Sequence, residues 1–378
     1  MKIYLDNAAT TRLDEQVLET MLPYMREEYG NPSSIHSFGR KNRAAIENAR
    51  KTVAKLLNVT PGEIFFTSGG TEADNMAIAQ SVESLGIKHI ISSKIEHHAV
   101  EHSVIELEKA GKVKLSWVNI DKKGNVDLAH LEELLKNNEK TLVSLMHANN
   151  EIGTLLPMGK VGKMCEKYGA IFHCDTVQTM GHFPMDMQRT KAHFITCAAH
   201  KFHGPKGVGF LYINHEVKIK PMIHGGSQER NMRGGTENVY GIVGLAKALE
   251  ICNNEMEEHI THIRGLKNYM REELIKAIPG IEFNGEIGDD NSLYTVLNCL
   301  FPSHKNIDGE MILFNLDIAG IAASGGSACS SGSNQGSHVL RGIGADVTRP
   351  AVRFSFCKYN TKQEIDYTVE KLKELFSK

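Results

Sequence analysis

The sequence predicts an α/β protein with one large domain and a second, smaller α+β domain. Segments with the pattern of strands and helices alternate in strict succession over about 150 residues, which is typical of a mostly parallel sheet covered by helices on both faces. After residue 240 the strands become shorter and the alternation ends. The length of 378 residues suits one large domain with a smaller companion.

The first elements are a short strand at residues 2–5 and helices at about 14–28 and 40–57. The sequence TPGE at 60–63 has the spacing of a capping box with proline at the first helical position, so it predicts a short helical turn. A strand at 64–67 should follow directly.

That strand leads through Ser68, Gly69 and Gly70 into a helix at 71–85. A strand that passes through two glycines into a helix directs free backbone N–H groups at one point, which favours an anion, most often a phosphate. The alternation then continues with strands at 89–93, 114–118, 142–146 and 170–174 and helices at 99–110, 127–137 and 159–168.

Residues 193–199 are mostly apolar and predict a strand buried in a parallel sheet, followed by a Gly/Pro loop and a strand at 208–213. Lys201 lies where the first of these strands ends. Open α/β sheets bind ligands at this edge, and a lysine in a partly dry crevice can lose its proton and act as an amine nucleophile.

The C-terminal part begins with a helix at 240–252 and a long helix at 255–278. Shorter strands at 281–284, 292–300, 318–323 and 352–356 and helices at 309–317 and 362–377 follow, the last behind the capping box TKQE at 361–364. We therefore expect residues 14–254 to form the large domain and residues 1–13 and 255–378 the small one. The small domain carries a Gly/Ser-rich loop, 325–337, too rich in these residues to pack.

The composition excludes several classes of function. A net charge of −2 gives no basic field for nucleic acid or an anionic membrane surface. No apolar run has the length of a signal peptide core or of a membrane span, and seven scattered cysteines form no CxxC pair. We expect a cytoplasmic protein.

Polar side chains follow four of the predicted strands, as EHH at 96–98, HANNE at 147–151, Asp175 with Gln178, and His200 with Lys201. Together they supply an amine, a carboxylate, imidazoles and amides, and the Gly69-Gly70 turn adds a phosphate cradle. This is the set of groups that pyridoxal 5′-phosphate requires, since its aldehyde takes a lysine and its ring nitrogen takes a carboxylate.

A series of short motifs covers nearly the whole chain: YLDNAATT at 4–11, GNPSSIH at 30–36, TSGGTEADN at 67–75, EHHAV at 96–100, NNEIG at 149–153, HCDTVQ at 173–178, AHKFHGPKG at 199–207, MRGGTEN at 232–238, SACSS at 327–331 and RFS at 353–355. On these motifs the chain resembles the cysteine desulfurases of the class V aminotransferase family, in the branch that serves nitrogenase and housekeeping iron–sulfur assembly. The resemblance implies the aspartate-aminotransferase-like architecture (fold type I), with a seven-stranded type of sheet.

The resemblance also implies roles for individual residues. Lys201 would hold the cofactor as a Schiff base, Asp175 would pair with the ring nitrogen, and Gln178 would hydrogen-bond the phenolic oxygen. His97, rather than its neighbour His98, would stack on the ring and move protons.

Further residues would bind phosphate and substrate, again by resemblance. The phosphate would be bound by Gly70, Thr71 and His200, and Thr236 would reach the phosphate of the other subunit of a homodimer. Arg353 and Asn150, the latter also close to the cofactor, would hold the substrate carboxylate.

Cys329 carries the specific reaction in this resemblance. It lies in the Gly/Ser-rich loop, where packing gives no reason for a cysteine. L-cysteine would displace Lys201, Lys201 would remove the α-proton, and the Cys329 thiolate would attack the substrate sulfur. Alanine would leave, and the persulfide on Cys329 would pass to an iron–sulfur scaffold or another sulfur acceptor. The sequence does not identify that acceptor.

One position departs from the family pattern. Relatives usually have a serine that donates to the phosphate two residues before the histidine that precedes the Schiff-base lysine, and this chain has Ala198. A hydrogen bond to a charged group contributes about 1.5–3 kcal/mol. We therefore expect weaker cofactor binding.

Other functions remain open from the sequence. A selenocysteine lyase or an aminotransferase on the same fold uses the same cofactor residues, although an aminotransferase has no use for Cys329. The spacing of Cys197, His200 and His203 allows a metal-binding interaction module, but a structural zinc site usually needs a fourth ligand. We expect no resident metal, although Cys329 could transiently ligate an iron–sulfur cluster on a partner protein.

Overall fold

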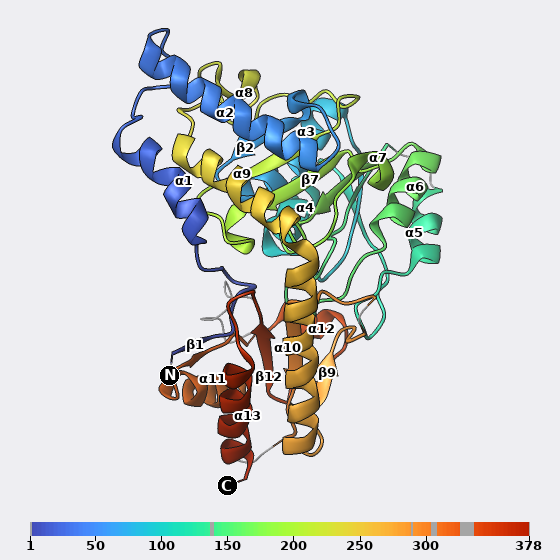
Figure 1. The fold of residues 1–378 in the computed structure, drawn as a ribbon. Helices are drawn as coiled ribbons and strands as arrows, with labels where there is room; N and C mark the ends of the chain where they lie inside the picture. Colours follow the sequence, from blue (N-terminus) through green and yellow to red (C-terminus); the bar gives the residue numbers. More distant parts are fainter. Residues whose placement is uncertain (1, 137–139, 289, 304–307, 326–335, 378) are drawn as a thin grey trace.

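The computed structural model describes residues 2–136, 140–288, 290–303, 308–325 and 336–377. Within these ranges the centre of the upper part is a seven-stranded sheet of order β2-β8-β7-β6-β5-β3-β4 (Figure 1). Its strands are β2 (Ile64–Thr67), β3 (His89–Ser92), β4 (Lys114–Trp117), β5 (Thr141–Ser144), β6 (Ile171–Asp175), β7 (Phe194–Ala198) and β8 (Gly209–Ile213). All neighbours from β7 to β4 are parallel, and β8 is antiparallel to β2 and β7. The predicted α/β fold with a mostly parallel sheet is confirmed.

Helices cover both faces of this sheet because successive strand residues point to opposite sides. On β2, for example, Phe66 packs in the cluster that contains Val17, Ile46 and Leu245, whereas Phe65 packs against Met76. The helices of this part are α1 (Glu15–Arg26), α2 (Ser37–Leu56), α3 (Gly70–Leu85), α4 (His98–Lys109), α5 (Leu128–Leu135), α6 (Met158–Tyr168), α7 (Met187–Thr190), α8 (Gln228–Asn231) and α9 (Val239–Asn254), with short 3₁₀ turns η1 (Pro61–Glu63) and η2 (Ala199–Lys201).

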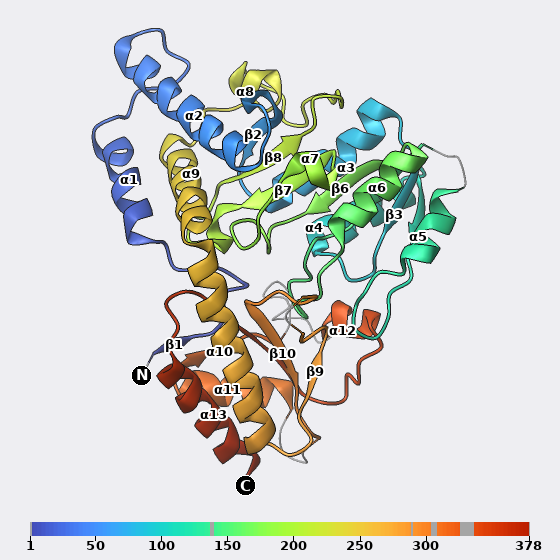
Figure 2. The same cartoon turned by 45° about the vertical axis from the view of Figure 1, so that its right-hand side comes forward.

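The lower part is built on smaller sheets (Figure 2). In the described residues, an antiparallel sheet has the order β12-β10-β9, and β1 pairs in parallel with β11. The elements are β1 (Ile3–Tyr4), α10 (Met256–Ala277), β9 (Glu282–Asn284), β10 (Val296–Leu300), α11 (Gly309–Ile318), β11 (Ile321–Ala322), α12 (His338–Gly342), β12 (Ala351–Ser355) and α13 (Lys362–Phe376). Helix α10 runs from the upper part into the lower part in both views.

Two predicted strands are shorter than expected, for local reasons. The strand predicted at 292–300 begins at Val296, because Ser292 makes an isolated bridge with Thr154 and Leu293 N–H donates to the Gly153 carbonyl. The strand predicted at 318–323 is reduced to β11, because α11 continues to Ile318 and Gly320 turns the chain at φ 80°. No helix in the described part of the chain is long and apolar enough to span a membrane.

Candidate active site

A cavity of about 240 Å³ opens where the carboxyl ends of β5, β6 and β7 meet the N-termini of α3 and α4. Residues from the N-terminal segment and from β12 close its other side. Among the predicted site residues, it is lined by Gly70, Thr71, His97, Asn150, Asp175, Gln178, His200, Lys201 and Arg353. The sheet edge therefore brings together the groups that the sequence separates by almost 300 residues.

Lys201 lies directly beyond β7, in the 3₁₀ turn η2. Its Nζ donates hydrogen bonds to the carbonyl oxygens of Ala8 and Ala9, over 2.6 and 2.9 Å. The amine is part-buried, and the N-terminal segment that carries β1 is thus tied to the end of β7. A ligand that takes the Lys201 amine has to draw it away from these two carbonyl groups.

The start of α3, which borders the cavity, has the backbone geometry that suits an anion. Its N-cap, Gly69, has φ 154°, a conformation that side-chain-bearing residues rarely adopt. At Gly70 a Cβ atom would lie 2.8 Å from Cγ2 of Val177, so only glycine fits without a shift. The first N–H groups of a helix have no intrahelical partner and carry partial positive charge, which suits a phosphate.

A wider hollow of about 430 Å³ continues outward from this helix start. It is lined by Thr10, Ser68, His200 and Lys206, among others, and Thr10 Oγ1 lies 3.2 Å from Nδ1 of His200. Burial, with Lys201 and Lys206 nearby, lowers the pKa of His200 to about 4. Hydroxyl groups, a neutral imidazole and the Lys206 ammonium therefore surround the place where the α3 N–H groups emerge.

Asp175 ends β6 and also lines the cavity. Its Oδ1 accepts from the Val177 N–H over 2.8 Å, and the residue is 5% exposed. Burial, reinforced by the neighbouring Asp74, raises the Asp175 pKa to about 7. A cation placed against this carboxyl group would favour its ionised form.

Asp74 on α3 also lines the cavity. Its Oδ1 lies 3.3 Å from Nε2 of His173. Burial raises the pKa of Asp74 to about 8 and lowers that of His173 to about 4, so both side chains are neutral near pH 7. Glu96, buried nearby, has its pKa raised well above the usual value for the same reason.

His97 is the N-cap of α4, and its Nδ1 accepts from the Ala99 N–H over 3.1 Å. A neutral imidazole that accepts at Nδ1 carries its proton on Nε2. Burial, with Lys201 close by, lowers the pKa of His97 to about 4. The helix cap thus fixes the tautomer of the ring at the cavity wall.

Arg353 on β12 contributes the guanidinium group of the site and is 1% exposed. Nη1 donates to the Asn150 carbonyl and Nη2 to Asp6 Oδ1, each over 2.8 Å. Within the described residues, Nε of Arg353 and Oδ1 of Asn150 are buried and have no hydrogen-bond partner. These two atoms are a donor and an acceptor left for a ligand.

The sequence as a whole identifies the family of this chain. Residues 3–368 match the profile of the class V aminotransferases. The chain belongs to the class V aminotransferase family. It is 44% identical to "Cysteine desulfurase IscS" of Dictyoglomus turgidum, over 100% of this chain and 95% of that protein.

Solved structures of this family share the fold. A NifS-like protein superposes with a TM-score of 0.92 at 40% identity, and the match covers 100% of both chains. The structure titled "SspA in complex with cysteine" superposes with a TM-score of 0.81 at 30% identity, over 95% of this chain and 100% of that one.

Two further residues that the family resemblance predicts are not among the residues shown to line the cavity. Thr236 is exposed and lies outside it. Cys329 lies outside the described residues. In the described part, Cys197, His200 and His203 form no group of converging metal ligands. His203 Nδ1 instead lies 2.9 Å from the Arg12 carbonyl oxygen.

Other residues of this class V site were missed by the sequence reasoning. The carbonyl groups of Ala8 and Ala9 and the side chains of Asp74, Thr10 and Lys206 all border the cavity or the hollow beside it. Each belongs to one of the motifs YLDNAATT, TSGGTEADN and AHKFHGPKG. The motifs identified the segments that border the cavity. Only the tertiary structure shows which backbone and side-chain atoms of these segments face it.

Proposed function

We propose that this chain is a cysteine desulfurase, which removes sulfur from L-cysteine and gives L-alanine and a persulfide on Cys329. The observation that carries the proposal is the convergence of the Lys201 amine, the Asp175 carboxyl group and the α3 N-terminus on one cavity. It is supported by the name of the 44% identical relative and by the cysteine complex of a structural neighbour.

The cavity fits pyridoxal 5′-phosphate. The Asp175 carboxyl group, buried and with its pKa raised to about 7, suits the ring nitrogen, which is cationic when protonated. The glycine-lined start of α3, with His200, Thr71 and Thr10 beside it, suits the phosphate. The bound cofactor supplies an aldehyde that takes an amine and a ring that withdraws electrons from the substrate α-carbon.

The chain's own residues then orient the substrate and move protons. Arg353 and Asn150 hold the carboxylate, Arg353 through its unpartnered Nε and Asn150 through its side-chain NH₂ group. Arg353 Nη2 is shared between Asp6 and the carboxylate. Lys201 Nζ, released from the carbonyls of Ala8 and Ala9, takes the proton from the α-carbon. His97 holds its proton on Nε2.

Cys329 performs the sulfur transfer. Its thiolate attacks the sulfur atom of the substrate, a sulfur–sulfur bond forms, and the bond between the substrate β-carbon and sulfur breaks. The electron pair of that bond stays with the substrate, which takes up protons and leaves as alanine. An iron–sulfur scaffold or another acceptor then receives the sulfur.

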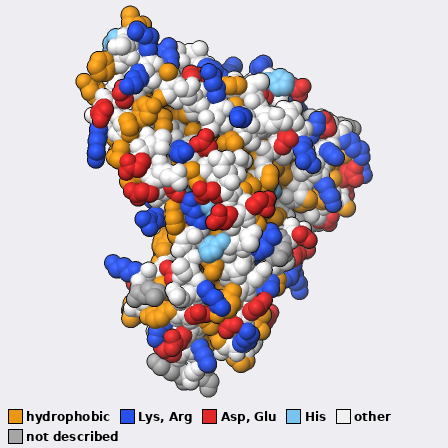
Figure 3. All heavy atoms as spheres, viewed as in Figure 1, with side chains coloured by type: hydrophobic (Ala, Val, Ile, Leu, Met, Phe, Trp, Pro, Cys, Tyr) orange, Lys and Arg blue, Asp and Glu red, His pale blue; other side chains and the backbone are white. Residues whose placement is uncertain are grey.

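The site is completed by a second copy of the chain. Thr236 is exposed, which suits a contact to the phosphate of the other subunit of a homodimer. Apolar side chains gather over α1 and α2 and the loop between them (Figure 3), and Tyr29 and Ile35 are 77% and 90% exposed. These surfaces are the place where we propose that the subunits meet, in a cytoplasmic protein.

The division into domains at residue 254 is part of the same proposal. One hydrophobic cluster contains buried residues from Val17 to Cys252. A second contains Ile3, Leu5 and residues between 263 and 372. The N-terminal segment thus packs with the C-terminal part, and it also brings Ala8 and Ala9 to Lys201.

The experiment is a product assay. Purified protein with bound cofactor is incubated with L-cysteine and a reductant, and alanine and sulfide are both measured. We expect equal amounts of the two products. Keto-acid-dependent alanine formation without sulfide would instead assign an aminotransferase, and activity confined to selenocysteine would assign a selenocysteine lyase.

A further inference from the structure

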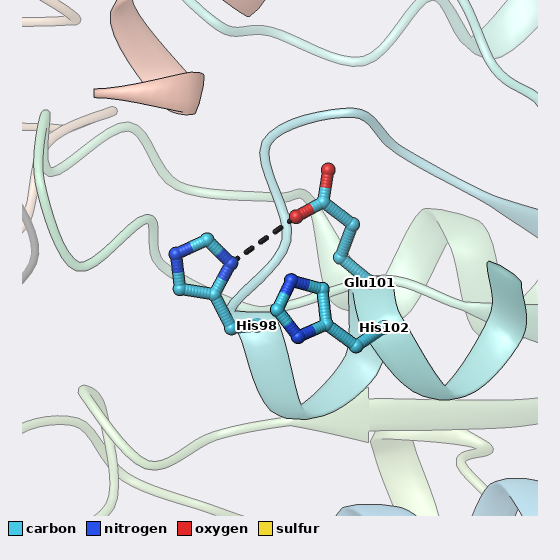
Figure 4. A group of neighbouring side chains, drawn as sticks. All are labelled: His98, Glu101 and His102. Carbon is cyan, nitrogen blue, oxygen red and sulfur yellow. Dashed lines mark hydrogen bonds and ion pairs between the residues drawn. The ribbon is translucent and has the colours of Figure 1, made fainter. Parts of the chain in front are cut away.

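Helix α4 carries a group of imidazole and carboxylate side chains next to the cavity but outside it. His98, Glu101 and His102 project from the same side of its first two turns (Figure 4). One nitrogen of each imidazole and one carboxylate oxygen all lie within 4.8 Å of one another. None of these three side chains lines the cavity of the proposed reaction.

We propose that His98, Glu101 and His102 form a binding site for a divalent transition-metal cation of the Zn²⁺ type. The two imidazoles favour Zn²⁺ and its neighbours over Mg²⁺ or Ca²⁺, and Zn²⁺ also accepts a carboxylate oxygen as a third ligand. Three protein ligands leave one position of a tetrahedral cation open to water. The proposal does not depend on the proposed reaction.

The spacing of the ligands follows from the helix. Residues four apart lie on one helix face, and a pair of histidines at this spacing is a common chelating arrangement for zinc. The sequence from His98 to His102, HAVEH, has the HxxEH pattern of one class of zinc peptidases. This chain shares the spacing of the two histidines with those peptidases but not their fold.

The geometry requires only a small closing movement. His98 Nδ1 already lies 3.2 Å from Glu101 Oε2, as expected for two ligands of one cation, which lie about 3.4 Å apart when bond lengths are near 2.1 Å. The rings of His98 and His102 are stacked with centroids 4.8 Å apart. Because His102 is exposed, rotation of its side chain can bring its nitrogen closer.

A second element keeps His98 in place. His338 of α12 packs on the His98 ring with centroids 4.3 Å apart, and its Nε2 lies 2.9 Å from the Glu96 carbonyl oxygen. His98 and Glu101 are both partly buried, with side chains 25% and 18% exposed. His338 is thus a positioning residue, and two of the ligands are preorganised while the third is free to close.

The test is a calorimetric titration of the cofactor-loaded protein with Zn²⁺, in a non-chelating buffer without free cysteine. The titrated protein carries Cys329→Ser, because the Cys329 thiolate would compete for zinc. The described cysteines are all buried. We expect one cation per chain. His98→Ala, His102→Ala and Glu101→Gln should each weaken binding by at least about tenfold.

The matched control is His215→Ala. His215 is exposed and its Nδ1 also lies 3.2 Å from a glutamate oxygen, that of Glu63, but no second imidazole from the described part of the chain joins the pair. This variant should bind Zn²⁺ like the parent. His102 is exposed, so its site tolerates alanine, and the cofactor absorbance of the His102→Ala variant reports whether it is folded. The proposal is wrong if the parent shows no saturable Zn²⁺ binding. It is also wrong if folded His102→Ala binds Zn²⁺ as tightly as His215→Ala.

Discussion

The Lys201 amine and the Gln178 side-chain amide donate to the same acceptor, the carbonyl oxygen of Ala8, over 2.6 and 3.0 Å. The two residues that the family resemblance assigns to the cofactor thus hold the N-terminal segment in the structure described here. Binding at Lys201 is therefore coupled to the position of residues 8 and 9.

Replacement of the lysine tests this coupling. Lys201→Ala should abolish the visible cofactor band and turnover. It should also lower the melting temperature of the cofactor-free protein, because hydrogen bonds from a charged group contribute about 1.5–3 kcal/mol each. Absorbance spectra and thermal melts measure both effects. Lys220→Ala, at an exposed lysine, should change neither the cofactor band nor the melting temperature. An unchanged melting temperature for Lys201→Ala would show that the bonds from Lys201 to Ala8 and Ala9 do not stabilise the fold.

Arg353→Lys should raise KM for L-cysteine by about tenfold or more, because an ammonium group cannot reproduce the planar fork of the guanidinium that contacts Asn150, Asp6 and the carboxylate. The cofactor band should persist, since the change affects substrate rather than cofactor. Arg349→Lys is the control, because Arg349 is also a mostly buried arginine, paired with Glu282, but it does not line the cavity. Steady-state kinetics that show the same KM for all three proteins would refute this role.

The buried carboxyl group of Asp74 predicts a dependence of stability on pH. Its pKa is raised to about 8, so the folded state holds a proton that the unfolded chain releases above its ordinary pKa of about 3.8. Stability is therefore lost as pH rises from about 4 to 8, by at most roughly 1.4 kcal/mol per pH unit. The neighbouring groups are His173, Asp175 and Glu96.

Asp74→Asn should remove much of this loss. Thermal melts of the cofactor-free protein at pH 5.5 and pH 8 should show a larger gain for the variant at pH 8. An equal effect at both pH values would mean that the Asp74 carboxyl group is already ionised in the folded protein.

Ala198→Ser should tighten cofactor binding. Ala198 lines the cavity, 2% exposed, and its Cβ would lie 3.7 Å from a Cβ built on Gly70. A hydroxyl there reaches the start of α3, where the phosphate is expected, and one hydrogen bond to a charged group corresponds to about tenfold or more in affinity. Titration of the cofactor-free protein with pyridoxal phosphate measures this affinity. Equal or weaker binding would show that position 198 does not face the phosphate.

The sequence predicted the local features well. Thr60 and Thr361 form the expected capping boxes, and the apolar run at residues 193–199 is the buried strand β7, with Lys201 at its end. These signals are short-range, since they depend on helix caps and on runs of buried side chains. The short helix α12 was missed because, at five residues, it has no period to detect.

Contacts between distant segments could not be predicted in the same way. The bond from Lys201 to Ala8 spans 193 residues, and the ion pair between Arg353 and Asp6 spans 347. Both depend on how the N-terminal segment packs against the second hydrophobic cluster. Likewise, the EHH motif predicted that His97 faces the site. That His98 lies between Glu101 of α4 and His338 of α12 is seen only in the structure.

In the proposed reaction Cys329 receives the sulfur atom of L-cysteine. The most direct measurement is mass spectrometry of the protein after a brief reaction with L-cysteine, without reductant, followed by alkylation and proteolysis. We expect one added sulfur atom on the peptide that contains Cys329. We expect none in Cys329→Ala, which should keep its cofactor absorbance. Sulfide and alanine released by Cys329→Ala at the rate of the parent, or added sulfur only at other cysteines, would contradict it.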